Sequence, residues 1–358
     1  MNLELTEEQV ALRDTVGRFL AEKAPISEHV RGLLDDPTGR TDVVWRGLAD
    51  LGATGLLVPP EYGGAGMTMV EAGIVAEELG AALHPGPWLS SAVAATRTLT
   101  RLGGAQAADI LTGIADGTTT ATVGPLDGAL IAADGGVLRG ELAGVPDAAA
   151  ADVLLVFAQD GDGTGLFAVN AAGVSLTAER TIDQTHKRFR VELNDVTADR
   201  LGTLSPDDVA AVVDDVLIAM AADALGAARA VMELAVEYAK VRKQFGQVIG
   251  SFQAIQHLCV DMYETVELAR SGVIHALWAA DNAGAQESHL AAVRAKAFSG
   301  QLAAVGDTAI QVFGGIGYTW EHDAHLYLKR LLGWSTFLGG PDRALTELGR
   351  SLTQKGTP

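Results

Sequence analysis

The sequence has little cysteine, little positive charge and no uninterrupted apolar run. Cys259 is the single cysteine among 358 residues, so the chain cannot form an internal disulfide. With 26 Lys and Arg against 45 Asp and Glu, the formal charge is −19, which disfavours nucleic acid and anionic membranes as partners. The segment 1–9 is acidic where a signal peptide would be basic, and charged residues interrupt every long apolar run. We expect a soluble, cytoplasmic protein with a large core.

The first third of the chain carries helix signals. A capping box at Thr6 to Gln9 precedes apolar residues at helical spacing, which predicts a helix that ends near Ala24-Pro25. Gly52 and Gly80 mark the ends of later helical patterns. We expect an N-terminal helical domain, 1–116, with further helices over residues 42–51, 69–79, 89–102 and 105–114.

A β-rich region follows at Gly117. Phe189, Val191 and Leu193 alternate with charged residues, which is the pattern of a half-buried strand. We assign 117–203 to a middle β domain, with further strands near residues 129–132, 136–142, 152–158, 165–169 and 174–176.

The remainder, 204–358, is predicted to be a helical bundle. Ser205-Pro206-Asp207-Asp208 combines an N-cap, a proline at the first helical position and acids in the first turn, so a long helix should run to about Val241. We expect Ser251 to cap the next helix, and later helices over residues 251–281, 287–312, 322–332 and 341–352.

Two segments of this bundle indicate a cofactor site. The first is 241–253, which contains Arg242, Gln244 and Phe245, and the second is 311–318, which is rich in glycine. A guanidinium can donate two parallel hydrogen bonds to a diphosphate, while amides and aromatic rings suit an adenine. The combination favours a dinucleotide.

The order helical, β, helical resembles the acyl-CoA dehydrogenase family, over essentially the full length. The motifs that carry the resemblance are segments 5–14, 51–64, 75–80, 242–247 and 311–318. The resemblance implies a mostly helical α+β fold, in which an N-terminal helical domain, a middle β-barrel-like domain and a C-terminal four-helix bundle follow one another. It also implies FAD as cofactor.

In this family FAD lies across a subunit interface. The resemblance implies that Arg242, Gln244 and Phe245 reach the pyrophosphate and ribityl chain of the neighbouring subunit's flavin. It assigns the adenosine end to Gln253, Gln311, Gly314, Gly315 and Gly317. The glycines are consistent with this role, because they let backbone N–H groups approach a ligand.

The chain departs from the family pattern at its own flavin and substrate site. Segment 122–128 replaces the family's Thr-Glu-Pro and Gly-Ser-Asp stretch, and segment 144–148 replaces its Trp-Ile-Thr-Asn-Gly stretch. The ring pocket is therefore expected to be eroded. Leu338 occupies the position of the catalytic Glu, and Leu cannot accept a proton.

Some family members carry the base on the long helix instead, at the position of Val216 here. Asp215, with Asp214 beside it, is the alternative candidate, although one residue along a helix is a rotation of about 100°. The simpler interpretation of Asp215 is an acid on a solvated helix face.

These features predict a noncatalytic subunit of a heteromeric, α2β2 acyl-CoA dehydrogenase, similar to the base-lacking subunits of actinobacterial steroid side-chain dehydrogenases. A paralogous partner would supply the Glu, the ring pocket and most of the acyl-CoA site, with one FAD per heterodimer. Two alternatives stay open: a self-sufficient flavoenzyme whose base is Asp215, and a flavin-free interaction protein of the same fold.

Other signals have simpler explanations. His322 and His325 have Glu321 nearby but no third ligand, so we predict no metal site. Cys259 is interpreted as an inert apolar residue. Phe313, Tyr318 and Trp320 could stack on a ligand or simply pack, and a structural salt bridge is the alternative for Arg242.

Overall fold

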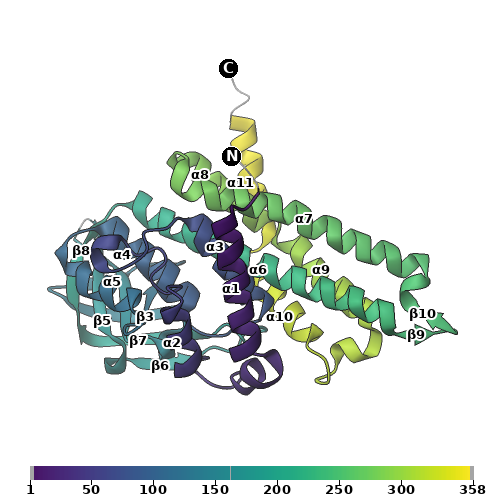
Figure 1. The fold of residues 1–358 in the computed structure, drawn as a ribbon. Helices are drawn as coiled ribbons and strands as arrows, with labels where there is room; N and C mark the ends of the chain where they lie inside the picture. Colours follow the sequence, from purple (N-terminus) through teal and green to yellow (C-terminus); the bar gives the residue numbers. More distant parts are fainter. Residues whose placement is uncertain (1–3, 162, 355–358) are drawn as a thin grey trace.

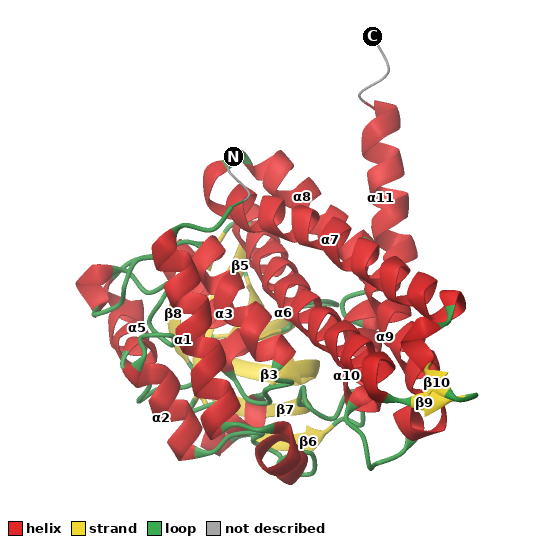
Figure 2. Ribbon diagram, turned by 45° about the vertical axis from the view of Figure 1, so that its right-hand side comes forward, coloured by secondary structure: helices red, strands yellow, loops and turns green. Residues whose placement is uncertain are grey.

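The computed structural model describes residues 4–161 and 163–354, and it is mostly helical with one large sheet. The large sheet lies at one end of the molecule and the long helices at the other, with the N-terminal helices between and over them (Figures 1 and 2). Among the described residues, no helix is both long and apolar enough to cross a membrane. The mostly helical α+β class predicted from the sequence is confirmed.

The N-terminal helices form where the sequence signals place them. At the first helix, the Thr6 hydroxyl accepts from the Gln9 N–H and the Gln9 side chain accepts from the Thr6 N–H, so the predicted capping box is present. Two π-helical segments, Ile26–Val30 and Leu89–Ala95, adjoin the regular helices. The regular ones are α1 (Glu7–Lys23), α2 (Asp42–Asp50), α3 (Met69–Ala81), α4 (Thr96–Leu102) and α5 (Ala108–Ala115).

Strands β1 to β8 form one sheet of order β6-β7-β3-β2-β4-β5-β8, to which β1 adds by parallel pairing with β4. Phe189, Val191 and Leu193 on β7 are all buried, which confirms the predicted alternation. The strands are β1 (Ala121–Gly124), β2 (Ile131–Asp134), β3 (Val137–Pro146), β4 (Val153–Asp160), β5 (Gly163–Asn170), β6 (Ser175–Ala178), β7 (Arg188–Thr197) and β8 (Asp199–Leu204).

Strand β8 was not predicted from the sequence. Its residues are mostly polar and only Leu204 is buried, so it lacks a clear period of two. It forms because β5 offers a free edge, and Arg200 donates to Asp160 at 2.6 Å beside that edge.

The C-terminal half is built around one 36-residue helix, α6 (Pro206–Val241), whose N-cap is Ser205 as predicted. It crosses α3 at two glycines: a Cβ on Gly226 would lie 1.8 Å from the Glu77 carbonyl oxygen, and one on Gly80 would lie 1.9 Å from that of Asp223. The two backbones therefore touch. The other helices of this half are α7 (Gln253–Asn282), α8 (Ala285–Ala297), α9 (Ser299–Phe313), α10 (Ala324–Thr336) and α11 (Pro341–Gln354).

Two predictions for this half were wrong. The Ser251 hydroxyl donates to the Val248 carbonyl at 2.6 Å, and the N-cap of α7 is Phe252, which makes no side-chain cap. The single helix expected over 287–312 is two helices, α8 and α9, which meet at Phe298. Ser299 and Gly300 are weak helix formers, but the apolar period continues across the break, so periodicity did not reveal it.

Candidate functional site

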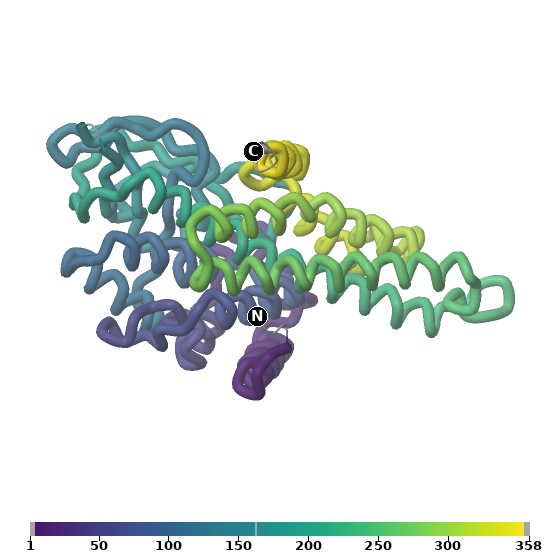
Figure 3. Tube along the Cα trace, turned by 90° about the horizontal axis from the view of Figure 1, so that it is seen from above, coloured from purple at the N-terminus to yellow at the C-terminus, as the bar shows by residue number. Residues whose placement is uncertain are grey.

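The segment 241–253 forms the exposed tip of the α6–α7 pair (Figures 1 and 3). Strands β9 (Lys243–Gln244) and β10 (Gln247–Val248) make a hairpin whose two turn residues, Phe245 and Gly246, have φ of 52° and 82°. Two left-handed residues are the geometry of a type I′ turn. A phenylalanine in that region is strained by about 1–3 kcal/mol, yet the Phe245 side chain is 93% exposed. The hairpin thus leaves its aromatic ring exposed, with an edge contact to the Phe252 ring at 6.2 Å between centroids.

Arg242 has a fixed backbone and a free side chain. Its N–H donates to the Tyr238 carbonyl at 2.9 Å, and its own carbonyl accepts from the Ile249 N–H at 2.8 Å. The residue is exposed, and no carboxylate of residues 4–161 or 163–354 lies within ion-pair distance of its guanidinium. The alternative of a structural salt bridge therefore has no support within the described chain.

The second segment, 311–318, follows the C-terminus of α9. Gly314 has φ 67° and ψ −145°, a combination open only to glycine, and a Cβ on Gly314 or Gly315 would meet no atom within 4 Å. A Cβ on Gly317 would instead lie 3.0 Å from that of Phe313. Backbone at 314–315 is thus open to a ligand, whereas Gly317 lets the loop fold back on its helix. Gln311 and Gln253 are both exposed at the surface.

The two segments lie at the same end of the bundle. Tyr238, one turn before Arg242, packs against Phe313 with ring centroids 5.0 Å apart. An exposed guanidinium, exposed amides and open glycine backbone fit the pyrophosphate and adenosine of a dinucleotide. These residues would hold that part of FAD.

This chain's own cleft lies elsewhere, between β1, α6 and the turn after α10. Its inner part is a cavity of about 30 Å³ whose lining includes Leu126, Val216 and Phe337. The guanidinium of Arg188 covers the Phe337 ring, with Cζ 4.2 Å from the ring centroid. Ligand pockets usually measure about 300 to 1,000 Å³. The inner cavity holds about one water molecule, not a flavin ring.

The outer part of the cleft is larger but carries several acids. It measures about 640 Å³, and its lining includes Asp127, Glu179 and Asp183 together with His186 and Arg188. Burial alone would raise the pKa of Asp183, but the hydrogen bond and charge of His186, with Arg330 and Thr185, together outweigh it and lower the pKa. Asp183 is therefore ionised, and this chamber is a poor place for a diphosphate.

Asp215 does not face the cleft. Its side chain is 1% exposed and accepts hydrogen bonds from Arg97 Nε at 2.8 Å and Arg101 Nη2 at 2.5 Å. The expected solvated helix face was wrong, because α4 brings two arginines onto it. The Asp215 carboxylate is buried against two guanidinium groups and does not line the cleft. Val216, one residue on, lines the inner cavity as the helix rotation predicts.

The structure also assembles a polar cluster that the sequence did not reveal. His289 Nδ1 lies 3.0 Å from both carboxylate oxygens of Asp214, and its Nε2 lies 2.8 Å from Glu347. The hydrogen bond with Asp214 raises the pKa of His289 to about 9, against the opposing effect of burial and with help from Glu347. The three residues border a cavity of about 130 Å³ that Leu338 also lines. They come from α6, α8 and α11, so no local pattern links them.

Lys296 lies beside the same cavity. It is 4% exposed, and its Nζ donates to the carbonyls of Trp334 at 2.5 Å and Ser335 at 3.3 Å. Burial, with the nearby Arg188, lowers the pKa of Lys296 to about 7. These bonds hold the C-terminal turn of α10, from which the chain continues to Leu338.

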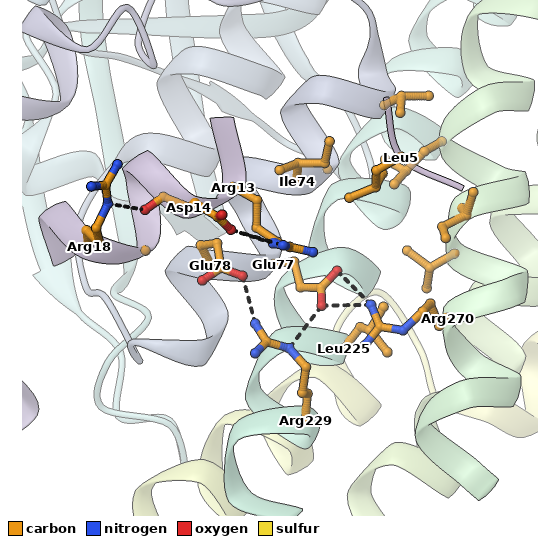
Figure 4. A pocket seen from close by; sticks show the side chains of 16 residues that line it. Leu5, Arg13, Asp14, Arg18, Ile74, Glu77, Glu78, Leu225, Arg229 and Arg270 are labelled. Atoms are coloured by element: carbon orange, nitrogen blue, oxygen red, sulfur yellow. Dashed lines mark hydrogen bonds and ion pairs between the residues drawn. The ribbon is translucent and has the colours of Figure 1, made fainter. Parts of the chain in front are cut away.

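A larger groove lies away from both cofactor segments, between α1, α3, α6 and α7, and measures about 910 Å³ (Figure 4). Glu77 accepts there from Arg229 at 3.1 Å and Arg270 at 2.9 Å, and Glu78 accepts from Arg229 at 2.7 Å. These ion pairs join α3 to α6 and α7. Because each of these two arginines is already paired, the groove is best understood as a structural junction.

Other candidate residues have structural roles. His322 Nδ1 accepts from the Ala324 N–H at 3.1 Å, and no group of three metal-ligating side chains occurs in the described ranges. Cys259 is partly buried, and burial raises the pKa of its thiol. Trp320 is half exposed, with Lys329 Nζ 4.8 Å from its ring centroid.

Comparison with known proteins decides the family. Residues 6–118 match the acyl-CoA dehydrogenase N-terminal domain, and residues 217–352 match the C-terminal domain. The acyl-CoA dehydrogenase IpdE2 of Mycobacterium tuberculosis is 35% identical over 344 residues, which is 96% of each chain. This chain belongs to the acyl-CoA dehydrogenase family. The family is FAD-dependent, which agrees with the cofactor expected from the motifs.

Solved acyl-CoA dehydrogenase structures share the whole fold. The chain superimposes on the ChsE4-ChsE5 complex from Mycobacterium tuberculosis with a TM-score of 0.90, at 27% identity and over the full length of both chains. It superimposes on a variant of the Tcur3481-Tcur3483 steroid acyl-CoA dehydrogenase with a TM-score of 0.87, at 29% identity and over 98% of each chain. Each of these two structures contains two different subunits, ChsE4 with ChsE5 and Tcur3481 with Tcur3483. This acyl-CoA dehydrogenase is thus related to members that form heteromers.

Proposed function

We propose that this chain is the noncatalytic subunit of a heteromeric, FAD-dependent acyl-CoA dehydrogenase. It supplies the half-site for the adenosine and pyrophosphate of FAD, and a paralogous partner supplies the flavin-ring pocket and the catalytic Glu. The observation that carries the proposal is the contrast between the two sites. Arg242 and the 314–315 backbone are open, whereas Leu338 stands in the base position on the outer chamber, and the inner cavity behind it measures only about 30 Å³.

The chemistry explains why the contrast matters. Dehydrogenation of an acyl-CoA requires a base that removes the α-proton, while FAD, when bound, accepts the hydride from the β-carbon. Neither Leu338 nor Val216 can accept a proton. Asp215 is held by Arg97 and Arg101, so the self-sufficient alternative lacks a base at this helix position.

The partner proposed is a paralogous subunit in an α2β2 assembly with one FAD per heterodimer. Support comes from ChsE4-ChsE5 and from the Tcur3481-Tcur3483 steroid enzyme, both of which pair two named chains. We take an acyl-CoA, and within that class a steroid side-chain CoA thioester, as the substrate, bound mainly by the partner.

The test is the flavin-to-protein ratio of this chain purified alone and after co-expression with its paralogue. We expect a colourless lone chain and one FAD per heterodimer, with dehydrogenation only in the complex. Two flavins per heterodimer would contradict the shared site. Turnover by the lone chain would show that it is self-sufficient.

A pair of charge variants separates this proposal from a flavin-free interaction protein. Arg242→Ala in the complex should abolish or greatly weaken flavin retention. Lys240→Ala, two residues earlier, removes another exposed cation, one that pairs with Glu237, and it should retain FAD. Equal flavin content in both variants would mean that the half-site is unused.

A further inference from the structure

Three aromatic rings stand in contact beneath the two cofactor segments. The ring of Tyr238 on α6 lies 5.0 Å from that of Phe313, which in turn lies 4.2 Å from the ring of His322. Their planes are inclined by 52° and 46°, and such tilted arrangements are favourable for aromatic pairs. Phe313, the middle ring, is 4% exposed.

Tyr238 ties this stack to the diphosphate end of the half-site. It lies one turn before Arg242, and its carbonyl accepts the Arg242 N–H at 2.9 Å. The hydrogen bond from Ile249 to the Arg242 carbonyl, at 2.8 Å, holds the other side of that residue. The place of the Tyr238 ring therefore determines where the Arg242 side chain leaves the helix.

Phe313 ties the stack to the glycine loop. It is the last residue of α9 and directly precedes Gly314 and Gly315. The loop folds back over it so closely that a Cβ on Gly317 would lie 3.0 Å from the Phe313 Cβ and 3.3 Å from the Ile310 oxygen. The Phe313 Cβ is thus part of the surface on which the loop rests, so a change at this residue would move the loop.

His322 anchors the far end of the stack. Its Nδ1 accepts the Ala324 N–H at the start of α10, and its carbonyl accepts from Arg31 Nη2 at 3.2 Å. Arg31 also donates through Nε to Asp323 at 2.8 Å. The third ring is fixed by α10 and by the N-terminal helical region, so the stack has a rigid support.

We propose that Phe313 is a positioning residue that sets the distance between Arg242 and the 314–317 loop, and through it the affinity for FAD. The inference rests on the proposed function, since it concerns the same half-site. A dinucleotide that spans two segments binds tightly only when both are held in place before it arrives. The segments belong to different helices, and the Tyr238–Phe313 contact joins those helices directly beneath them.

The test is FAD titration of the deflavinated heteromeric complex with variants of this chain. Phe313→Leu and Tyr238→Leu each remove one ring, and we expect the Kd of FAD to rise by about three- to tenfold, the scale of one aromatic contact. Tyr238→Phe keeps the ring and should bind FAD as the wild type does. Phe167→Leu removes a buried ring from the sheet, so it loses stability without changing the Kd.

The outcomes are distinguishable. If the wild-type complex binds FAD and both ring-loss variants bind it equally well, the positioning role is wrong and the proposed function stands. A rise in Kd for Phe167→Leu equal to that for Phe313→Leu would also overturn it, since the effect would follow stability alone. If the wild-type complex binds no FAD, the proposed function itself fails. Should Phe313→Leu not fold, the comparison of Tyr238→Leu with Tyr238→Phe decides the question.

Discussion

Asp215 on α6 accepts a hydrogen bond from Nε of Arg97 on α4 at 2.8 Å, in a position where the carboxylate is 1% exposed. Arg97 also donates to Asp281 at 2.8 Å, and the other oxygen of Asp281 accepts the Met69 N–H at 2.6 Å. One buried network thus joins α4, α6, α7 and the start of α3. Asp215 is a structural residue of the helical core.

Asp215→Asn should therefore act on stability. The substitution leaves two arginines without their buried counter-charge, and we expect the free energy of unfolding to fall by about 3–5 kcal/mol. Urea denaturation of the purified chain measures this change. Asp207→Asn, on the exposed first turn of the same helix, is the control and should change stability by about 1 kcal/mol or less. Loss of turnover in the complex without loss of stability would restore Asp215 as a candidate base.

Leu338→Glu should not create an active lone chain. The substitution returns a carboxylate to the family's base position, which borders the outer chamber together with Asp127 and Asp183, while the neighbouring Phe337 lines the inner cavity of about 30 Å³ beneath Arg188. That inner cavity has no room for a flavin ring, and in the proposed function the partner holds the flavin, so no hydride acceptor stands next to a substrate of the lone chain. The measurement is dehydrogenation of acyl-CoA by the lone variant with added FAD and an artificial electron acceptor. Turnover above that of the parent chain would show that the lone chain is inactive only because it lacks the base.

Loss of the proton from His289 should lower the free energy of unfolding at alkaline pH. Its hydrogen bond to Asp214 is the main cause that raises its pKa, to about 9, above the ordinary value of 6.5. Because the folded state holds the proton more tightly than the unfolded state, this contribution is complete below pH 6.5. It is lost as the pH rises toward and through 9. Denaturation midpoints at pH 6 and pH 9.5 should differ less in His289→Gln than in the wild type. Equal differences in the two proteins would show that His289 does not titrate in this range.

Two glycine substitutions should have opposite effects. Gly226→Ala forces a Cβ to within 1.8 Å of the Glu77 oxygen, so α3 and α6 must separate and we expect a loss of about 1–3 kcal/mol or more. Gly272→Ala, on the exposed side of α7, meets nothing within 4 Å. It should stabilise the chain by about 0.5–1 kcal/mol, the helix preference of Ala over Gly. Thermal melts of both variants compare the two. A stable Gly226→Ala would mean that the crossing is looser than the structure has it.

Local signals were enough to predict much of the fold. The caps at Thr6 and Ser205, the apolar periods and the alternation on β7 each depend on residues within a few positions of one another. The order of helices and strands followed from them. The cofactor segments were also readable, because the motif around Arg242 and the glycines after Phe313 are each continuous in the chain.

The sequence by itself thus determined the fold class and the residues proposed to bind FAD, since both depend on residues that are close together in the sequence. Only the tertiary structure decided what the long-range pairs do. Asp215 is hydrogen-bonded to Arg97, which is 118 positions away in the sequence, and His289 is hydrogen-bonded to Asp214, which is 75 positions away. Such contacts depend on how helices pack, so no spacing along the chain predicts them. The same packing of helices narrows the inner cavity and brings Tyr238 against Phe313. It also buries Asp215, the acid beside the expected base position, in the core.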